Sequence, residues 1–211
     1  MRITKFGHSC LLVEEESARI LIDPGDYSVL PTSLGHLDAI IITHEHGDHY
    51  TIDNLKKALS ENFGLPIITN QSVAEKLQAE GIKATTVGPG ENFDVNGVLV
   101  KGVGEWHAEN HKCQLTIKNT GYFIGDRFFY PGDALTVPEK PVEILAYPAV
   151  APWMKIAESL EYLKAVKPKV AFPVHDSFLK FGGPYYDHPE RHAKEWGIKW
   201  TVIEEGKSIE V

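Results

Sequence analysis

Residues 39–49 read Ala39-Ile40-Ile41-Ile42-Thr43-His44-Glu45-His46-Gly47-Asp48-His49. The first four are apolar and mostly β-branched, which is typical of a short strand buried on both faces. The polar residues follow without a break, so we expect the strand to end where the histidines begin. Ligands of open α/β sheets bind beyond the carboxyl ends of the strands. The stretch therefore predicts an α/β protein with a polar site at a sheet edge.

The spacing of these side chains favours metal binding. His44 and His46 alternate by two in an extended segment, so their imidazoles project to the same side. Gly47 is expected to permit a bend that turns Asp48 and His49 toward a second position. Imidazole and carboxylate suit zinc, with manganese or iron as alternatives. The competing interpretation is a polar helix entrance whose histidines are satisfied by internal hydrogen bonds.

Further ligands are expected downstream, because one loop does not complete two metal sites. His107, Asp133 and His175 each lie just past a predicted strand. We therefore expect them to meet the histidine loop at one rim. His111 competes with His107, and we favour His107 because it lies nearer the preceding strand.

The pattern of apolar residues, glycines and prolines predicts the other elements. Strands are expected at 3–6, 11–14, 19–23, 66–69, 85–87, 98–103, 113–118, 122–124, 127–130, 142–146, 169–173, 199–203 and 207–210, and helices at 51–60, 72–79, 156–166 and 189–196. Gly125-Asp126 joins two of these strands as a hairpin. The economical arrangement is two sheets face to face with helices outside, in a single domain of residues 1–211.

Composition limits the classes of function. The chain has 211 residues, 43% hydrophobic and 24% charged, as in an ordinary globular protein. With 21 basic and 29 acidic residues its net charge is −8, and no basic face for nucleic acid is evident. Small anions remain acceptable, because bound dications reverse the local field. We expect a small-molecule substrate and no nucleic-acid partner, and homo-oligomerisation is left open.

Cysteine usage and hydropathy predict the cellular compartment. Only Cys10 and Cys113 occur, so we expect two buried thiols and no disulfide framework. The first residues lack an apolar signal core, and no apolar run approaches the ~18–20 residues that span a bilayer. The prediction is a cytoplasmic protein without a membrane partner.

Taken together, these residues resemble the metallo-β-lactamase superfamily, whose signature is His-x-His-x-Asp-His followed by a later His, a Gly-Asp pair and a final His. The resemblance runs from Ile3 to His175 and implies a four-layer αββα sandwich, an α/β (α+β) fold, with two divalent metal ions. Carried over, one ion is held by His44, His46 and His107, the other by Asp48, His49 and His175, and Asp133 bridges them.

The superfamily's chemistry is hydrolysis by water activated between two metal ions, with Asp48 orienting or deprotonating it. Phe6-Gly7-His8-Ser9 and Leu21-Ile22-Asp23-Pro24 resemble the branch that contains ascorbate-6-phosphate lactonase. We expect hydrolysis of a small ester, lactone or phosphoester. The alternatives are a flavodiiron-like oxidoreductase, which would carry a glutamate in place of His46, and a metal-binding protein without turnover.

Other side chains have two interpretations each. His8 either lines the pocket or lies in a turn. Asp23 either hydrogen-bonds within the metal loop or forms a simple Asp-Pro-Gly turn. Trp153 either walls the substrate pocket or packs in the core. His188 and His192, four apart on a predicted helix, either bind a metal or lie on a solvated face, which we favour.

Overall fold

The central strands bury both of their faces. The structure, a computed structural model, describes residues 1–211. In strand β3 (Ala18–Ile22), Ile20 and Ile22 join one apolar cluster and Leu21 joins another. Tyr122 and Phe123 divide in the same way in β9 (Gly121–Ile124). Since neighbouring residues of a strand point to opposite faces, each sheet needs a packed layer on both sides.

The strands form two seven-stranded sheets. The first sheet contains, in spatial order, β14 (Ser208–Glu210), β1 (Arg2–Lys5), β2 (Leu11–Glu15), β3, β4 (Ala39–Ile42), β5 (Ile67–Thr69) and β6 (Thr85–Thr86). The second contains β13 (Lys199–Trp200), β12 (Val170–Val174), β11 (Ile144–Pro148), β10 (Phe128–Tyr130), β9, β8 (Val98–Val103) and β7 (Asn92–Val95).

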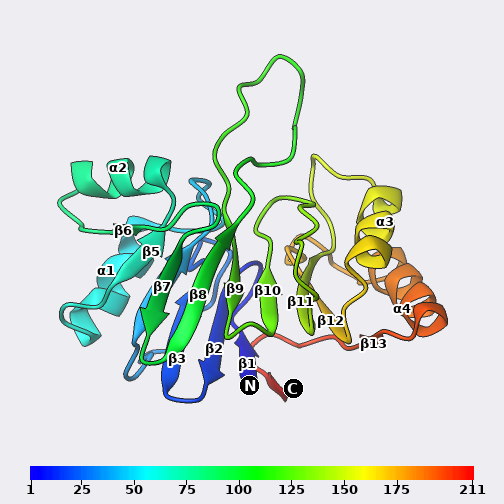
Figure 1. Cartoon of the computed structure of the whole chain (residues 1–211), viewed down its shortest axis with the longest axis horizontal. Coiled ribbons are helices and arrows are strands. Elements are labelled where there is room, and N and C mark those ends of the chain that lie inside the picture. The colour runs from blue at the N-terminus through cyan, green and yellow to red at the C-terminus, as the bar shows by residue number, and fades with distance from the viewer.

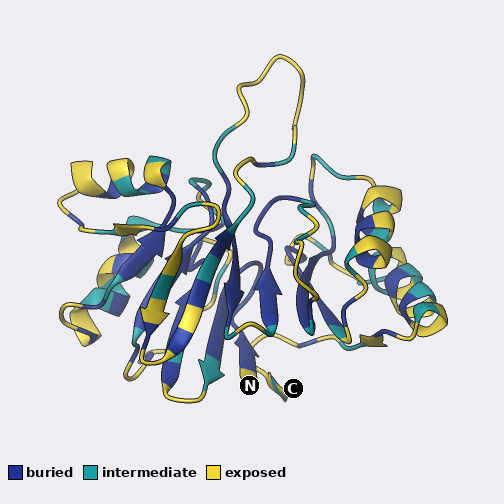
Figure 2. Ribbon diagram, in the orientation of Figure 1, coloured by how far each residue is buried: buried dark blue, intermediate teal, exposed yellow.

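Helices cover the outer face of each sheet (Figure 1). They are α1 (Ile52–Glu61) and α2 (Gln71–Ala79) on the first sheet, and α3 (Ile156–Val166) and α4 (Pro184–Trp196) on the second. Three apolar clusters of 22, 15 and 11 buried residues fill the three spaces between four layers. Figure 2 shows the strands largely buried and the outer helix faces exposed. The predicted αββα sandwich is confirmed.

Strand direction brings the polar loops to one rim. β8 and β10 are each antiparallel to β9, and β10, β11 and β12 are parallel, so β8, β10 and β12 end at the same edge. The first sheet meets this edge where Thr120 N–H donates to Thr43 O at 3.0 Å, just after β4. Loops after strands of both sheets therefore face a common space.

Local rules account for the helix starts. Thr51 caps α1, with its hydroxyl accepting from Asn54 N–H at 3.2 Å. α3 has the predicted bounds. α4 begins at Pro184 and not at Pro189, because Pro184 occupies the first helical turn directly after Gly183, where proline is favoured. Residues 184–188, which were expected to lie outside the helix, thus belong to it.

One predicted strand is absent, and one observed strand was not predicted. Residues 113–118 alternate in polarity, yet they belong to an exposed loop between β8 and β9, which projects from the rim in Figure 1, and Leu115 is 96% exposed. A period of two is a local pattern, whereas a strand also needs a partner along its length. Strand β7 was not predicted, because asparagine and aspartate disfavour strands and the element is an edge.

The two cysteines differ in their surroundings. Both are free thiols, and Cys10 is fully buried as predicted. Cys113 is exposed, which contradicts the prediction of two buried thiols, because the loop that carries it leaves the sheet. None of the four helices combines the length and the apolar character that crossing a bilayer requires.

Candidate metal centre

Asp23, directly after β3, supports the histidine loop from behind. Its Oδ1 accepts from Thr43 N–H at 2.8 Å, and Oδ2 accepts from the Thr43 hydroxyl at 2.7 Å and lies 2.6 Å from His49 Nδ1. It is fully buried, and its φ of 43° is a left-handed conformation that residues with a side chain rarely adopt. Asp23 thus makes the hydrogen bonds expected of a residue that orients ligands, beyond those of a simple turn.

Three histidines have Nδ1 tied to an acceptor outside the cluster. His107 Nδ1 lies 2.6 Å from Ala108 O, and His175 Nδ1 lies 2.6 Å from Val150 O. His49 Nδ1 faces the carboxylate described above. Carbonyl and carboxylate oxygens only accept, so Nδ1 carries the proton and the neutral ring keeps its lone pair on Nε2. The three Nε2 atoms are thereby oriented to bind a cation.

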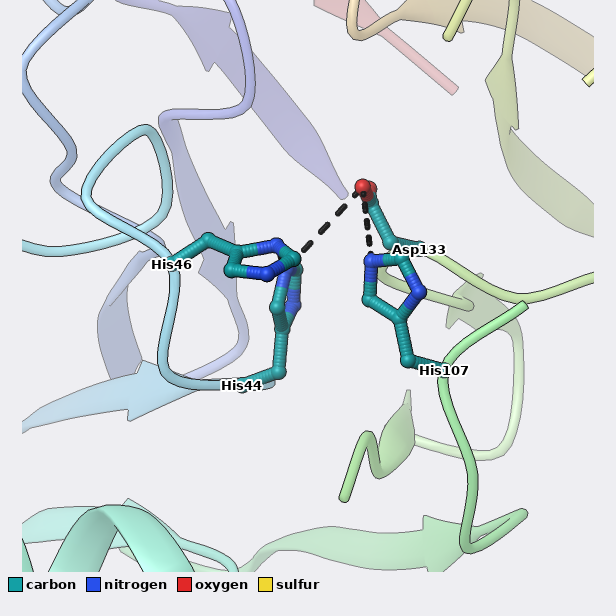
Figure 3. Close-up of side chains that lie close together, drawn as sticks. All are labelled: His44, His46, His107 and Asp133. Atoms are coloured by element: carbon teal, nitrogen blue, oxygen red, sulfur yellow. Dashed lines mark hydrogen bonds and ion pairs between the residues drawn. The ribbon is translucent and has the colours of Figure 1, made fainter. Parts of the chain in front are cut away.

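One group of convergent atoms comes from His44, His46, His107 and Asp133, whose ligand atoms lie within 4.8 Å of one another (Figure 3). His44 Nε2 is 3.0 Å from His46 Nδ1. His107 Nε2 is 3.3 Å and His44 Nε2 is 4.0 Å from Asp133 Oδ2. Four ligand atoms of this chemistry at this separation suit one small divalent cation.

A second group adjoins the first and shares Asp133. It contains His49, Asp133 and His175, with His49 Nε2 3.1 Å from Asp133 Oδ1 and His175 Nε2 3.2 Å from Oδ2. Asp48 Oδ2 lies 3.4 Å from His175 Nε2. The structure thus brings all seven residues named from the sequence into one cluster, with Asp133 in both groups. The role of each as a metal ligand stays a prediction.

Unpartnered buried atoms test whether the site fits a metal. His107 Nε2, His175 Nε2 and Asp133 Oδ1 are buried and have no hydrogen-bond partner, because the nearby ion-pair contacts lack hydrogen-bond geometry. Buried polar atoms are nearly always paired, and leaving one unpaired costs about 1–3 kcal/mol. Cations bound by the two groups would satisfy all three atoms, so the residues fit the metal ions that the resemblance implies.

Charge within the cluster is balanced by protons when no cation is bound. Burial lowers the pKa of His44 well below its ordinary value and lowers that of His46. Burial would lower the pKa of His175 too, but the Asp133 and Asp48 carboxylates outweigh it and raise the pKa to about 9. Asp133 and Asp23 likewise raise the pKa of His49 well above its ordinary value. His49 and His175 thus hold protons at pH 7 that a cation must displace.

Metal loading at pH 7 is expected to release about two protons per chain, from His49 and His175, because ligands bind deprotonated. Below pH 9, near the His175 pKa, the apparent zinc affinity should fall about tenfold per pH unit for each proton displaced. Calorimetric titration of zinc in two buffers with different ionisation enthalpies measures the number released. Equal heats in both buffers would contradict this balance.

Gly25, which lies next to the loop that carries His44 to His49, must be glycine because two backbone segments approach each other closely there. A Cβ on Gly25 would lie 1.9 Å from Asp48 O, whereas a Cβ on Gly47 would meet only Asp26 Oδ2 at 3.5 Å. Gly25 lets the segment after β3 pack on the metal loop, where Asp26 N–H donates to Gly47 O at 2.9 Å. Gly47 has no left-handed φ, so the bend expected there does not require glycine.

Gly25→Ala is expected to lower the free energy of unfolding by about 1–3 kcal/mol, because the new methyl group forces two backbones apart. Gly47→Ala, the matched control, should change it by less than about 1 kcal/mol. Urea unfolding of both variants, with zinc content measured alongside, tests this difference. Equal stability of the two variants would show that the loops separate without cost.

Comparison with known sequences identifies the family. A family model described as a beta-lactamase superfamily domain matches residues 2–175, which include every residue of the cluster. This chain belongs to the metallo-β-lactamase superfamily. The αββα layers and the shared metal cluster described above agree with that membership.

Relatives of this superfamily member extend the comparison. Protein Rv0786c of Mycobacterium tuberculosis is 40% identical over 184 residues, covering 85% of both chains. A UPF0173 metal-dependent hydrolase of Carboxydothermus hydrogenoformans is 27% identical over 194 residues, covering 83% of this chain and 84% of the relative. The structure of Igni18, a metallo hydrolase from Ignicoccus hospitalis, aligns with a TM-score of 0.76 at 20% identity over 99% and 97% of the chains, which shows the shared fold.

The superfamily is established, but the branch within it is not. The N-terminal residues that resemble the ascorbate-6-phosphate lactonase branch do have defined places: His8 and Asp23 lie beside the cluster. None of the relatives above bears that activity in its name. Membership of that branch stays a prediction.

A cleft of about 410 Å³ opens onto the cluster. Its lining combines metal-site residues with Asp26, Tyr27, Asn110, Pro152, Trp153 and Phe178. Trp153 Nε1 donates to Asp133 Oδ2 at 3.0 Å, so this side chain belongs to the pocket wall, one of its two sequence interpretations. Neither lysine nor arginine lines the cleft. Its size is that of a small-molecule site.

Several other sequence candidates lie outside the cluster. His111 is exposed and accepts from Cys113 N–H at 3.2 Å, so the structure places His107, and not His111, in the metal groups. His188 and His192 are on α4 and belong to none of the metal groups. Glu45, which lies between His44 and His46 in the sequence and is not a candidate ligand, forms a 3.0 Å ion pair with Lys76.

Asn119 is a supporting residue that sequence reasoning missed. It is buried, its Oδ1 accepts from Asp133 N–H at 3.0 Å, and its Nδ2 donates to Pro131 O at 2.9 Å. A Cβ on Gly132 would lie only 2.4 Å from that Oδ1. The Pro131-Gly132 pair indicated a tight backbone before Asp133, but nothing local indicated that Asn119 holds it.

Proposed function

We propose that this chain is a hydrolase that uses two divalent cations to cleave a small ester, lactone or phosphoester. One observation carries the proposal: buried imidazole nitrogens and a carboxylate oxygen converge without hydrogen-bond partners on a space that opens to a cleft. The Carboxydothermus hydrogenoformans relative, which is named a metal-dependent hydrolase, supports the same class.

The two groups divide the proposed ligands. His44, His46 and His107 would hold one cation, Asp48, His49 and His175 the other, and Asp133 would contact both. Nitrogen and carboxylate donors favour zinc, and manganese or iron fit the same set. Bound there, the cations would lower the pKa of a water from 15.7 toward about 7 and stabilise the developing oxyanion.

The chain's own residues would order the reaction. Asp48 lines the cleft and is partly exposed, so it would orient the attacking water and accept its proton. Burial would raise the pKa of Asp48, but polar contacts with His175 and His8 and the positive charge of His49 keep it below its ordinary range, so the carboxylate is ionised and able to accept. Hydrolysis then adds water across the ester bond and yields an acid and an alcohol.

Cleft size and charge support a small substrate. A volume of about 410 Å³ suits a metabolite, and neither the cleft lining nor the net charge of −8 offers a cationic surface to a nucleic acid. We therefore retain a small-molecule substrate, a cytoplasmic location and the absence of nucleic-acid and membrane partners as proposals. Self-association stays open.

His46 favours hydrolysis over the oxidoreductase alternative. Its Nδ1 lies 3.0 Å from His44 Nε2, where the flavodiiron pattern would place a glutamate. A visible absorbance band from flavin or iron in the purified protein would support the oxidoreductase alternative. A colourless protein that binds divalent metal and hydrolyses no substrate would instead favour the non-catalytic one.

The proposal is tested by elemental analysis of the purified protein coupled to a substrate screen. The expected result is two equivalents of a divalent metal and hydrolysis of at least one lactone, phosphodiester or thioester. Dialysis against a chelator should abolish the activity, and added zinc or manganese should restore it. Activity that survives complete metal removal would contradict the mechanism.

A further inference from the structure

His8 lies in the turn between β1 and β2 and is fully buried against the second metal group. Its ring centroid is 3.9 Å from that of His175 and 4.5 Å from that of Phe178, so the ring is packed between them. Its carbonyl accepts from His175 N–H at 2.7 Å. Gly7 makes this possible, because a Cβ there would lie 2.5 Å from Tyr27 O. The turn thus fixes the position of the imidazole.

The hydrogen bond at Nδ1 decides which nitrogen of His8 carries the proton. His8 Nδ1 lies 3.2 Å from the backbone nitrogen of Ser177, an N–H that only donates. His8 Nδ1 must therefore accept with its lone pair, and the ring proton resides on Nε2. His107 and His175 have the opposite arrangement, because their Nδ1 atoms face carbonyl oxygens. His8 differs from these two proposed ligands in tautomer.

The inward Nε2–H of His8 has one neighbour that accepts. It lies 3.5 Å from Asp48 Oδ2, a contact just outside hydrogen-bond geometry, and it has no hydrogen-bond partner although it is buried. Ligand atoms of His8, Asp48 and His175 lie within 4.8 Å, so distance alone would also admit His8 as a metal ligand. A nitrogen that carries its proton has no lone pair to offer, and this argues against ligation.

We propose that His8 is a positioning residue that directs its Nε2–H toward Asp48 Oδ2 and fixes this carboxylate, and that His8 does not bind metal. The inference rests on the proposed function, since Asp48 is its proposed proton acceptor. Fixing one oxygen limits rotation of the carboxylate and leaves it a defined orientation toward the cleft. Groups that orient a reacting side chain in this way commonly contribute 10–100-fold to activity, as an approximate range.

Three variants separate the donor from the acceptor function of His8. His8→Asn retains an acceptor for Ser177 N–H near the Nδ1 position and lacks the donor to Asp48. His8→Gln places an amide N–H near the Nε2 position, and His8→Phe keeps only the packed ring. We expect zinc content at saturation to match the wild type in both amide variants. We expect kcat to fall about 10–100-fold in His8→Asn and His8→Phe and to be largely restored in His8→Gln.

A tautomer measurement tests the inference without a substrate. Long-range ¹H–¹⁵N correlation spectra of the metal-free wild-type chain, with His8 assigned by its absence in His8→Asn, should show the Nε2–H form. Added Zn²⁺ should shift Nε2 of His175 and leave Nε2 of His8 protonated. An Nδ1–H form, a zinc-dependent loss of the His8 Nε2 proton, or loss of one zinc equivalent in both amide variants would overturn the proposal. A wild-type chain that binds no zinc would contradict the proposed function instead.

Discussion

Replacing His46 by alanine is expected to remove metal from the first group and to lower kcat/KM by about 10³-fold or more while the chain stays folded. The loss follows because a cation stabilises transition-state charge by several kcal/mol. His46 provides one of the four convergent atoms there, with Nδ1 3.0 Å from His44 Nε2. It is only half-buried and belongs to none of the apolar clusters, so folding does not depend on it.

His111→Ala is the matched control for this variant. It removes a histidine from the exposed loop that follows His107, outside both metal groups. Metal content by elemental analysis, kcat/KM and a circular dichroism spectrum should be unchanged in His111→Ala, and only the spectrum should be unchanged in His46→Ala. Full metal content and activity in His46→Ala would contradict the proposed metal-dependent mechanism.

The histidine cluster could be predicted because each part of it obeys a local rule. A fully apolar run predicts a buried strand, and polar residues directly after it are expected at the rim beyond the strand's carboxyl end. The polar residues that follow β4, β8, β10 and β12 all lie beyond strand ends in this way. The order of these strands in parallel and antiparallel pairs then brings their ends together. The layers could be predicted for the same reason, since runs buried on both faces require covering helices.

Contacts between distant segments could not be predicted in this way. Asn119 reads as a turn residue in sequence, yet it holds the backbone of Asp133 through a contact that exists only once both loops are placed. Residues 113–118 are the opposite case, because a local pattern predicted a strand that the structure lacks. Their polarity alternates, but they belong to neither sheet. Proton positions are still harder to predict from sequence. The tautomer of His8, for example, depends on its contact with Ser177, 169 residues along the chain.

Lys5→Met is expected to lower the free energy of unfolding by about 3–5 kcal/mol, the usual cost of leaving a buried charge without its partner. Lys5 Nζ lies 2.7 Å from both carboxylate oxygens of Asp176 and donates to Pro173 O at 3.1 Å. Both side chains are at most 5% exposed. Urea unfolding measures the change. The exposed pair of Lys169 with Glu143 provides the control, and Lys169→Met should cost less than about 1 kcal/mol.

The same variant should weaken zinc binding, because Asp176 directly follows His175. His175 has a φ of 59°, a left-handed conformation that costs about 1–3 kcal/mol and persists only where neighbouring contacts impose it. Lys5 and the Tyr186 hydroxyl, which donates to Asp176 Oδ2 at 2.7 Å, supply those contacts on one side. Replacing both charges, Lys5→Met with Asp176→Leu, should recover most of the stability, since no buried charge is left unpaired. If the double variant regains stability but not zinc affinity, the ion pair serves to hold His175 in place; if it regains both, the pair serves only the fold.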